Sequence, residues 1–316
     1  MRTVLLIVHT VREEATKVAA TFATDLRQAG LGIRVLDSDA AALREVGLED
    51  AEIVPAGEGA AAECELAVVF GGDGTILRAA EMCRSTETPV LGVNLGHVGF
   101  LAEADVEDVH EVVRGVVDRS WTVEERLTID VSVTVGGEVV ATNWALNEAS
   151  VEKAARERML ELVVEIDARP VSRWGCDGVV CATPTGSTAY NFSAGGPIVW
   201  PEVQALLMVP ISAHALFARP LVVSPEATLA IEVVGEHATG VLWCDGRRAA
   251  DLPVGARVEV VRGQETVRLA RLQTAPFADR LVRKFDLPVT GWRGSAARRS
   301  PGGGAGPRAA DGSGAA

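Results

Sequence analysis

Two short segments of the sequence combine glycine with hydroxyl or carboxyl side chains in a spacing that suits phosphate chemistry. The first is Gly71-Gly72-Asp73-Gly74-Thr75, which follows an apolar run at 66–70 and precedes a helical pattern from about residue 76 to 83. Glycine lets backbone amides approach phosphate oxygens, and the N-terminus of the following helix adds partial positive charge. The predicted phosphate-binding residues of this loop are therefore Gly71, Gly72, Gly74 and Thr75.

Asp73 is unusual in such a loop, because a carboxylate repels phosphate. Two roles would explain it: binding a metal ion that bridges the phosphates, or accepting the proton of an attacking hydroxyl. The alternative is a plain strand-to-helix turn in which Asp73 caps the helix. A Gly-Gly-Asp-Gly sequence alone does not distinguish this structural role from the two chemical roles. Arg78, one turn into the helix, is either a further phosphate contact or a solvated helix residue.

The second segment is longer and runs from Gly175 to Pro197. An apolar strand at 178–182 leads into Thr-Pro-Thr-Gly-Ser-Thr at 183–188 and then into a short helical pattern at 188–194. Hydroxyls and amides gathered at a helix N-terminus suit an anion or a sugar. Tyr190, the single tyrosine of the chain, follows directly, where its ring could stack on a base. A well-capped turn with a packed tyrosine is the alternative.

Two smaller groups also carry chemistry. Asn147-Glu148 ends a hairpin strand, and an amide next to a carboxylate suits a ribose diol. The stretch at 94–101, Asn-Leu-Gly-His-Val-Gly-Phe-Leu, has two glycines beside a strand end, which predicts close approach of a ligand or of another domain. His97 and His214 are each either a proton carrier or a structural histidine, and the structural role is favoured.

Lysine, a common phosphate ligand, is nearly absent. Of the 30 basic residues among 316, only Lys17, Lys153 and Lys284 are lysine, and none follows a glycine. A Walker A loop needs Gly-Lys-Ser/Thr, and a protein kinase needs a strand lysine in a Val-Ala-Ile-Lys context. Both classes are excluded, so phosphates must be held by backbone amides, arginine or metal.

Charge and composition exclude further classes. The net charge of −13 argues against nucleic acid and against a polybasic membrane surface as partners. No run approaches the ~20 apolar residues of a membrane span, and the apolar run at 4–8 is too short for a signal peptide. Five cysteines without a Cys-x-x-Cys pair argue against a disulfide framework or a zinc site. We therefore expect a reduced, cytoplasmic protein.

The first third of the chain alternates strand and helix signals. Apolar runs predict strands, helical periodicity predicts helices between them, and Gly30 lies where a helix C-cap belongs. The predicted strands are 4–8, 33–36, 66–70 and 90–93, and the predicted helices are 13–28, 76–83 and 108–117. This alternation predicts a doubly wound, Rossmann-like α/β domain over 1–122.

After Trp121 the pattern changes to short strands. Alternating segments at 128–135 and 138–146, joined by Gly136-Gly137, predict a β-hairpin. Eight further short strands follow at 159–166, 178–182, 207–211, 221–223, 228–233, 241–244, 257–261 and 267–271. Helix signals are confined to 188–194 and 201–206, so the range 123–273 is predicted as a mostly-β sandwich.

The end of the chain divides into two parts. A last helix is predicted at 277–284, and we expect 274–293 to pack back on the first domain. From 294 to 316 there are seven glycines, two prolines and no apolar residue larger than alanine. Such a segment cannot bury enough surface to offset its ordering entropy, so we predict a disordered tail.

Taken in order, these segments closely resemble the NAD kinases. The resemblance covers about residues 1–293 and rests most on the Thr-Pro-Thr-Gly-Ser-Thr-Ala-Tyr segment, because Gly-Gly-Asp-Gly-Thr is shared with diacylglycerol kinases and is similar to a 6-phosphofructokinase loop. It implies a first domain similar to those two kinase classes. The bias of 27 arginines to three lysines suggests a high-GC genome, as in actinobacterial members.

The resemblance implies transfer of the terminal phosphoryl group of ATP, another nucleoside triphosphate or polyphosphate to the 2′-hydroxyl of the adenosine ribose of NAD, giving NADP. It implies that Asp73 accepts the hydroxyl proton, that Gly74 contacts NAD and that Arg158, with Arg156 as a competitor, is a basic contact. A contact from Arg247 is left open, since some relatives carry glutamine there. The remaining NAD-binding residues that it implies are Asn147, Glu148, Asp177, Thr188, Ala189, Tyr190, Asn191, Phe192 and Ser193.

The resemblance also implies partners. A divalent metal, Mg²⁺ first, should bridge the donor phosphates, and no protein side chains are assigned to hold it. A homodimer or homotetramer built through the β-rich domain is expected. The alternatives are a lipid or sugar kinase with the same glycine loop, which the net charge opposes for a lipid substrate, and a non-catalytic dinucleotide-sensing module. Donor choice, NAD-versus-NADH preference, regulation and subunit number stay open.

Overall fold

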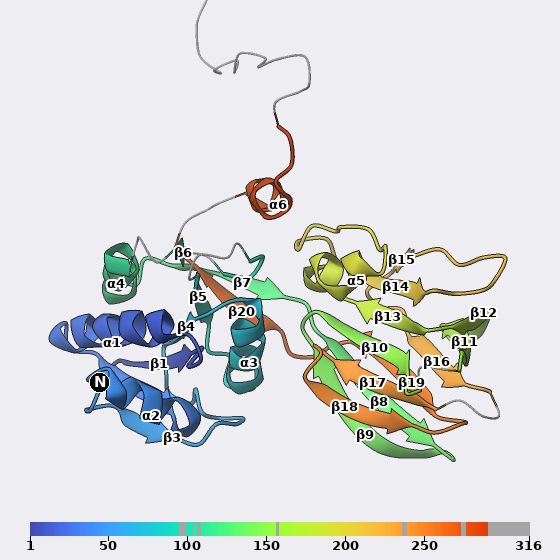
Figure 1. The fold of residues 1–316 in the computed structure, drawn as a ribbon, viewed down its shortest axis with the longest axis horizontal. Helices are drawn as coiled ribbons and strands as arrows, with labels where there is room; N and C mark the ends of the chain where they lie inside the picture. Colours follow the sequence, from blue (N-terminus) through green and yellow to red (C-terminus); the bar gives the residue numbers. More distant parts are fainter. Residues whose placement is uncertain are drawn as a thin grey trace, which may run out of the picture.

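The computed structural model describes residues 1–94, 99–102, 104–105, 109–155, 158–235, 239–272 and 276–289. An α/β part with one large sheet comes first and a β-rich part with two sheets follows it (Figure 1). This is the predicted fold class. The predicted tail at 294–316, His97 and Arg156 lie outside the described residues.

The first sheet is eight-stranded, in the order β3-β2-β1-β4-β5-β20-β7, with β6 paired to β5. Strands β1 to β5 pair in parallel, and β4 and β5 are buried along their whole length, as the continuous apolar runs predict. The strands are β1 (Thr3–Val8), β2 (Gly32–Leu36), β3 (Glu52–Val54), β4 (Leu66–Phe70), β5 (Val90–Asn94), β6 (Ala104–Asp105), β7 (Thr122–Arg126) and β20 (Val267–Arg271).

Helices cover both faces of this sheet, which makes it doubly wound. Helices α1 (Glu13–Gln28), α2 (Asp37–Glu45) and α4 (Val109–Asp118) share one apolar cluster with one face of β1, and α3 (Asp73–Cys83) packs in the cluster on the other face. Gly30 adopts φ +86 just after the C-cap of α1, as predicted. The α2–β3 unit was not predicted, because its short elements carry little apolar periodicity.

The β-rich part is a sandwich of two six-stranded sheets, in the orders β15-β14-β13-β10-β17-β18 and β12-β11-β16-β19-β8-β9. Side chains from both sheets form a single apolar cluster around the buried Trp174. The strands are β8 (Ile129–Val135), β9 (Glu138–Ala145), β10 (Glu148–Lys153), β11 (Leu160–Ile166), β12 (Arg169–Cys176), β13 (Gly178–Ala182), β14 (Leu206–Ile211), β15 (Leu221–Val223), β16 (Leu229–Val233), β17 (Gly240–Cys244), β18 (Arg248–Leu252) and β19 (Arg257–Arg262).

Turns and short helices in the β-rich part agree only partly with the sequence pattern. The β8–β9 hairpin turns at Gly136 and Gly137, both at positive φ, as predicted. The predicted helix at 188–194 is a 3₁₀ turn, η2 (Thr185–Thr188), followed by the short helix α5 (Tyr190–Ser193). The helix predicted at 201–206 is wrong, since β14 begins at Leu206 after a turn.

Sequence periodicity does not reveal which sheet the strand β20 joins. Its sequence was grouped with the β-rich range, but it pairs with β5 in parallel and with β7 antiparallel in the first sheet. A short apolar strand has the same pattern in either sheet, and its partners here lie more than a hundred residues away in sequence. The predicted domain boundaries, 1–122 and 123–273, stay a prediction.

Helix α6 (Phe277–Phe285) confirms the predicted last helix. Phe277 and Phe285 each lie 5.8 Å, between ring centroids, from Phe100, which follows β5. On the other side, Phe285 lies 4.7 Å from Phe192 and Phe277 lies 5.1 Å from Trp200. The helix therefore contacts both parts of the molecule. Within the described residues, no helix is long and apolar enough to cross a membrane.

Candidate active site

The glycine loop lies at the point where the strand order of the first sheet reverses. The sheet runs outward from β1 through β2 and β3 in one direction, and from β4 through β5 in the other. In open α/β sheets, ligands bind at the carboxyl ends of the strands at this switch point. The loops that leave β1 and β4 there are residues 9–12 and 71–75.

Those two loops line a pocket of about 440 Å³, together with the turn after β17; we call it the cationic pocket. Its lining includes Arg12, Arg78, Arg247 and His9, and no acidic residue among those described. The Nδ1 atom of His9 is buried with no hydrogen-bond partner within the described part of the chain. Gly72, Gly74 and Thr75 of the glycine loop also line the pocket. This charge and the glycine backbone suit a group of phosphates.

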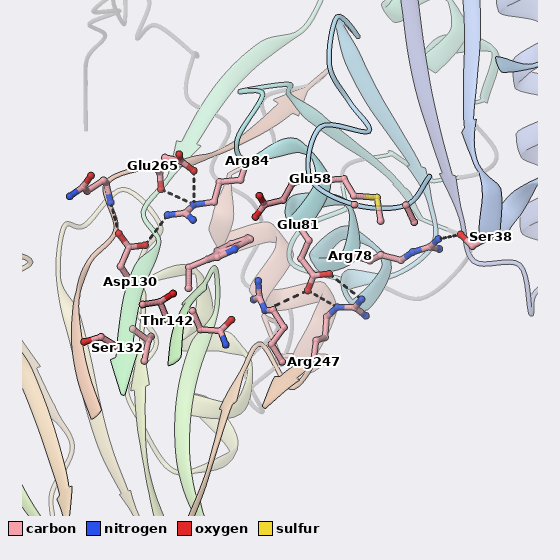
Figure 2. Close-up of a pocket in the computed structure, with 18 of the residues that line it drawn as sticks. Ser38, Glu58, Arg78, Glu81, Arg84, Asp130, Ser132, Thr142, Arg247 and Glu265 are labelled. Atoms are coloured by element: carbon pink, nitrogen blue, oxygen red, sulfur yellow. Dashed lines mark hydrogen bonds and ion pairs between the residues drawn. The ribbon is translucent and has the colours of Figure 1, made fainter. Parts of the chain in front are cut away.

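Arg78 is not a solvated helix residue. Its guanidinium lies 2.8 Å from Asp39 and 2.6 Å from the hydroxyl of Ser38 (Figure 2). Asp39 is 1% exposed and also accepts a hydrogen bond of 3.0 Å from the backbone amide of Val8 at the end of β1. Helix α2 therefore fixes Arg78 in the wall of the cationic pocket.

Asp73 is the first residue of α3, and it does not cap that helix. Its carboxylate accepts backbone hydrogen bonds from Phe100 at 3.0 Å and Leu101 at 3.1 Å. A Cβ at Gly99 would overlap this carboxylate, so the glycine at position 99 leaves the room that the Asp73 side chain needs. The carboxylate is thus oriented by the segment after β5, at the carboxyl end of the sheet.

Asn147 and Glu148 form a tight corner between β9 and β10. The carboxylate of Asp245 accepts backbone hydrogen bonds from Leu146 at 3.0 Å, Asn147 at 2.7 Å and Glu148 at 3.4 Å. Asp245 is 7% exposed; burial raises its pKa, while these amides and Arg248 act in the opposite direction. One buried carboxylate therefore holds the Asn147–Glu148 corner.

The hydroxyl-rich segment packs against the same corner. Thr183 donates from its backbone amide to the carbonyl of Asn147 at 2.9 Å and from Oγ1 to the carbonyl of Leu146 at 2.6 Å. The amide of Gly186 donates to Thr183 Oγ1 at 3.1 Å, and a Cβ at Gly186 would overlap the backbone of Asn147. The segment from 183 to 190 is thereby brought onto the Asn147–Glu148 corner.

Acidic and phenolic groups gather at this corner. Glu148 is 8% exposed, and burial, then Asp245, raises its pKa to about 8, against the hydrogen bond from the Tyr190 backbone. Burial raises the pKa of Tyr190, and Glu152, Glu148 and Asp177 raise it further. The half-buried Asp177 pairs with Lys153 at 2.5 Å, and this hydrogen bond holds the pKa of Asp177 below its ordinary value.

Known proteins are similar to this chain over most of its length. The family model described as the ATP-NAD kinase N-terminal domain matches residues 4–121, and that of the ATP-NAD kinase C-terminal domain matches residues 146–272. The chain belongs to the NAD kinase family. This confirms the family, the fold class and the enzyme class predicted from the sequence, and it removes the lipid-kinase, sugar-kinase and sensing-module alternatives.

Individual members of the NAD kinase family are similar to this chain in sequence and in fold. An NAD kinase of Thermobifida fusca is 60% identical over 307 residues, covering 95% of this chain and 94% of its own. NAD kinase 2 of Streptomyces avermitilis is 59% identical over 93% of this chain and 97% of its own. A yeast NADH kinase complexed with NADH has a TM-score of 0.78 at 26% identity, covering 90% of this chain and 86% of that one. An Archaeoglobus fulgidus NAD kinase in complex with ATP, at 24% identity and a TM-score of 0.68, shares the fold over 90% of this chain and 99% of that one.

The structure brings most of the predicted NAD-kinase residues into two groups. The first is the loop 71–75 with Arg78, and the second is the Asn147–Glu148 corner with Tyr190 and Asp177. Asn191 is fully buried and donates to the carbonyls of Ser187 and Pro197, each at 3.2 Å, so it supports the segment from within. The roles assigned to these residues stay predictions, as do those of Thr188, Ala189, Phe192, Ser193 and the exposed Arg158.

Glu152 and Asp245 shape the site but escaped sequence reasoning, whereas Thr183 was in the predicted hydroxyl-rich segment and only its supporting role was missed. Glu152 faces the Tyr190 hydroxyl, and Thr183 and Asp245 hold the Asn147–Glu148 corner. For Asp245 a signal was present: Cys-Asp-Gly-Arg at 244–247 is a turn motif, and its aspartate adopts φ +52. In the described residues, no group of three or more His, Cys, Asp or Glu is placed to hold a metal ion.

Proposed function

We propose that this protein transfers the terminal phosphoryl group of ATP to the 2′-hydroxyl of the adenosine ribose of NAD, giving NADP. One observation carries the proposal. A single turn after β17 touches both groups of residues: Asp245 holds the Asn147–Glu148 corner, and Arg247, two residues on, lines the cationic pocket beside the glycine loop. Donor phosphates and an acceptor ribose would therefore meet across this turn.

The cationic pocket would hold the donor phosphates. Phosphoryl transfer depends mainly on in-line positioning and on neutralising the charge of the transferred group. Backbone amides of the glycine loop and the N-terminus of α3 supply donors, while Arg12, Arg78 and Arg247 supply positive charge. Because Arg78 is already held by Asp39, it needs little reorganisation when phosphate binds.

Asp73 would accept the proton of the 2′-hydroxyl. A positioned general base contributes typically ~10² to 10⁴-fold to a rate. The amides of Phe100 and Leu101 orient its carboxylate without supplying a positive charge that would weaken it as a base. This arrangement supports the role that the family resemblance implied for Asp73.

The Asn147–Glu148 corner would hold the acceptor. A carboxyl whose pKa is about 8 is largely protonated at neutral pH, so Glu148 can donate one hydrogen bond and accept another from a ribose diol. Its Oε2 atom is buried and has no hydrogen-bond partner among the described residues, which leaves it available to a ligand. Tyr190, half-buried beside it, offers a ring face to the adenine.

Mg²⁺ is proposed as the divalent cofactor. Mg²⁺ sites commonly use one or two carboxylates plus substrate phosphates instead of a full protein cage. The residues present fit a metal held mainly by the donor phosphates, because Asp73, the single carboxylate of the glycine loop, is assigned to the hydroxyl proton. The metal, when bound, would neutralise charge on the donor phosphates.

We also propose a cytoplasmic homo-oligomer. All five cysteines are free and buried, as expected in a reducing compartment. The β-rich part exposes large apolar side chains on its strands, among them Val139, Val140, Val171 and Val222, which a second copy could cover. Light scattering on the purified protein will give the subunit number.

The activity is tested by incubating the purified protein with ATP, Mg²⁺ and NAD and measuring NADP with an NADP-specific dehydrogenase. Formation of NADP that depends on all three components is the expected result. Parallel reactions with NADH and with inorganic polyphosphate define the acceptor and the donor. Absence of NADP from NAD with every donor would overturn the proposed function.

A further inference from the structure

A second, larger cleft runs from the cationic pocket along α3. We call it the α3 cleft; it has a volume of about 1200 Å³ and shares Thr10, Arg78 and Arg247 with the cationic pocket. Figure 2 shows its side chains converging from the flank of α3 and from the facing sheet of the β-rich part. Among the described residues, none of those predicted to bind NAD lines it. The α3 cleft is therefore separate from the Asn147–Glu148 corner.

The two connected spaces differ in charge. The cationic pocket has three arginines and no acid among its described lining residues; two of them, Arg78 and Arg247, are shared with the α3 cleft and pair there with Asp39 and Glu81. The α3 cleft has four arginines opposed by five acids, Asp39, Glu58, Glu81, Asp130 and Glu265. Its arginines are mostly engaged: Arg247 with Glu81 at 2.9 Å and Arg84 with Asp130 at 2.8 Å. The cationic pocket suits phosphate, whereas the α3 cleft suits an uncharged polar group.

An aromatic stack lies in the α3 cleft. The guanidinium groups of Arg84 and Arg248 lie over the Trp144 ring, 4.6 and 4.4 Å from its centroid. Asp130 fixes Arg84, and Asp245 fixes Arg248 at 2.9 Å. Planar guanidinium groups and aromatic rings are both surfaces on which nucleic-acid bases stack. Because the two guanidinium groups lie over the Trp144 ring itself, a planar heterocycle would stack on the outward face of one of these guanidinium groups.

Hydrogen-bonding groups surround this stack. Ser132, Thr142 and Asn143 line the α3 cleft from β8 and β9, and their side chains make no hydrogen bond to other described residues. Glu58 faces them from the side of the first sheet (Figure 2). Hydroxyl, amide and carboxylate groups are what a ribose or a base edge needs for recognition.

We propose that the α3 cleft is the nucleoside subsite for the phosphoryl donor, an inference that rests on the proposed kinase function. The donor base stacks beside Trp144, its ribose meets the polar groups of β8 and β9, and its phosphates pass between Arg78 and Arg247 to the glycine loop. Along α3, the path from Gly72 to Arg84 measures roughly 18 Å at ~1.5 Å per residue, which suits an extended nucleoside triphosphate. NAD then binds at the other group of residues.

The proposal has a consequence for donor choice. Inorganic polyphosphate carries negative charge along its whole length, so it needs cationic groups along its whole path. The α3 cleft does not continue the positive charge of the cationic pocket. A nucleoside triphosphate, charged at one end only, matches the change of charge from one space to the next.

The experiment uses Trp144→Leu, which removes the ring that supports the Arg84 and Arg248 guanidinium groups in the stack and keeps an apolar side chain. We expect the KM for ATP to rise at least about ten-fold, as the loss of a base–aromatic stack implies, with the KM for NAD unchanged. The Ki of inorganic tripolyphosphate as a competitor of ATP should also stay unchanged, since it occupies the cationic pocket alone. The matched control is Trp243→Leu, a partly exposed tryptophan on β17 that does not line the α3 cleft.

A second variant, Ser132→Trp, fills the α3 cleft without removing the stack and covers the case in which Trp144→Leu does not fold. It should raise the KM for ATP and again spare that for NAD. An unchanged KM for ATP in a folded variant would overturn the inference, and so would an equal weakening of ATP and tripolyphosphate. Neither result touches the proposed function, which fails only if the wild-type protein forms no NADP.

Discussion

The glycine loop and the Asn147–Glu148 corner are both backbone turns that present reactive groups, but they are held in different ways. The backbone of the glycine loop depends on its neighbours in sequence, since β4 ends and α3 begins within the loop itself, and only the Asp73 side chain is held from a distance, by the amides of Phe100 and Leu101. The corner depends on Asp245 and Thr183, which lie far along the chain and bind its backbone amides and carbonyls. Chemistry at the loop should therefore be separable from folding, whereas chemistry at the corner should not.

The largest expected effect tests the loop. Asp73→Asn removes the proton acceptor while its carboxamide oxygen can still accept from Phe100 or Leu101. We expect kcat to fall by ~10² to 10⁴-fold with NAD affinity nearly unchanged, and a smaller loss of stability, because the carboxamide NH2 group must face one of the two backbone amides. Turnover by coupled NADP detection and binding by calorimetry measure both. Asp118→Asn, on the exposed end of α4, is the control. Wild-type turnover in Asp73→Asn would contradict the assignment of the base.

The next effect tests the corner. In Asp245→Asn an amide group must face at least one of the backbone N–H groups of residues 146–148, which leaves a buried donor unpaired. We expect a loss of about 1–3 kcal/mol in the free energy of unfolding together with a higher KM for NAD. Urea unfolding and initial-rate kinetics measure the two changes. A variant with a normal KM for NAD but reduced stability would show that the corner does not need Asp245 for its shape.

The third effect is a dependence on pH. The pKa of Glu148 is raised to about 8 in the folded protein against 4.5 in the unfolded chain, so the folded state binds the extra proton between these values. The free energy of unfolding therefore decreases as pH rises from about 5 to 8, by ~1.4 kcal/mol per pH unit at most. Glu148→Gln should remove this slope. Urea unfolding of both proteins at pH 6 and 9 is the measurement, and equal slopes would refute the raised pKa.

The smallest effect concerns a single hydroxyl. Thr183→Val keeps the side-chain shape but removes the hydrogen bonds to the Leu146 carbonyl and from the Gly186 amide. We expect a loss of about 1–3 kcal/mol in unfolding free energy, at the lower end of the range if water replaces the hydroxyl. Thr21→Val on the exposed face of α1 is the matched control, and it should change stability by less than ~0.5 kcal/mol. Equal losses in both variants would show that the hydroxyl does not support the corner.

Much of the fold could be predicted because several elements are complete in local sequence. Helix α1 has its predicted bounds and its glycine after the C-cap, and β4 and the β8–β9 hairpin follow from an apolar run and from Gly136-Gly137. The α2–β3 unit was missed because it is short and weakly apolar, yet it supplies the Asp39 that holds Arg78. Its importance comes from a contact across the sheet, which periodicity does not contain.

The residues of the candidate site also fall into those that local sequence predicts and those that depend on distant partners. The glycine loop, Asp73, the Asn147–Glu148 pair and Tyr190 were predicted because their residue types and order indicate chemistry without reference to anything distant. The supporting roles of Asp245, Thr183 and Glu152 were not predicted, because no local feature reveals which backbone group or side chain a residue in a turn or a strand will bind, even where a turn motif is present, as at Asp245. Long-range partners become visible only when strands pair.

The sequence by itself determined the chemistry of this protein: a lysine-poor chain must hold phosphate by backbone amides and arginine, and its ordered motifs place it among the NAD kinases. Only the tertiary structure decided the geometry. It joined β20 to the first sheet, buried Asp245 under the Asn147–Glu148 corner and opened the α3 cleft beside the cationic pocket. The physical reason is that glycine, charge and periodicity act over a few neighbouring residues, whereas burial and cleft shape arise from surfaces that meet only after the chain has folded.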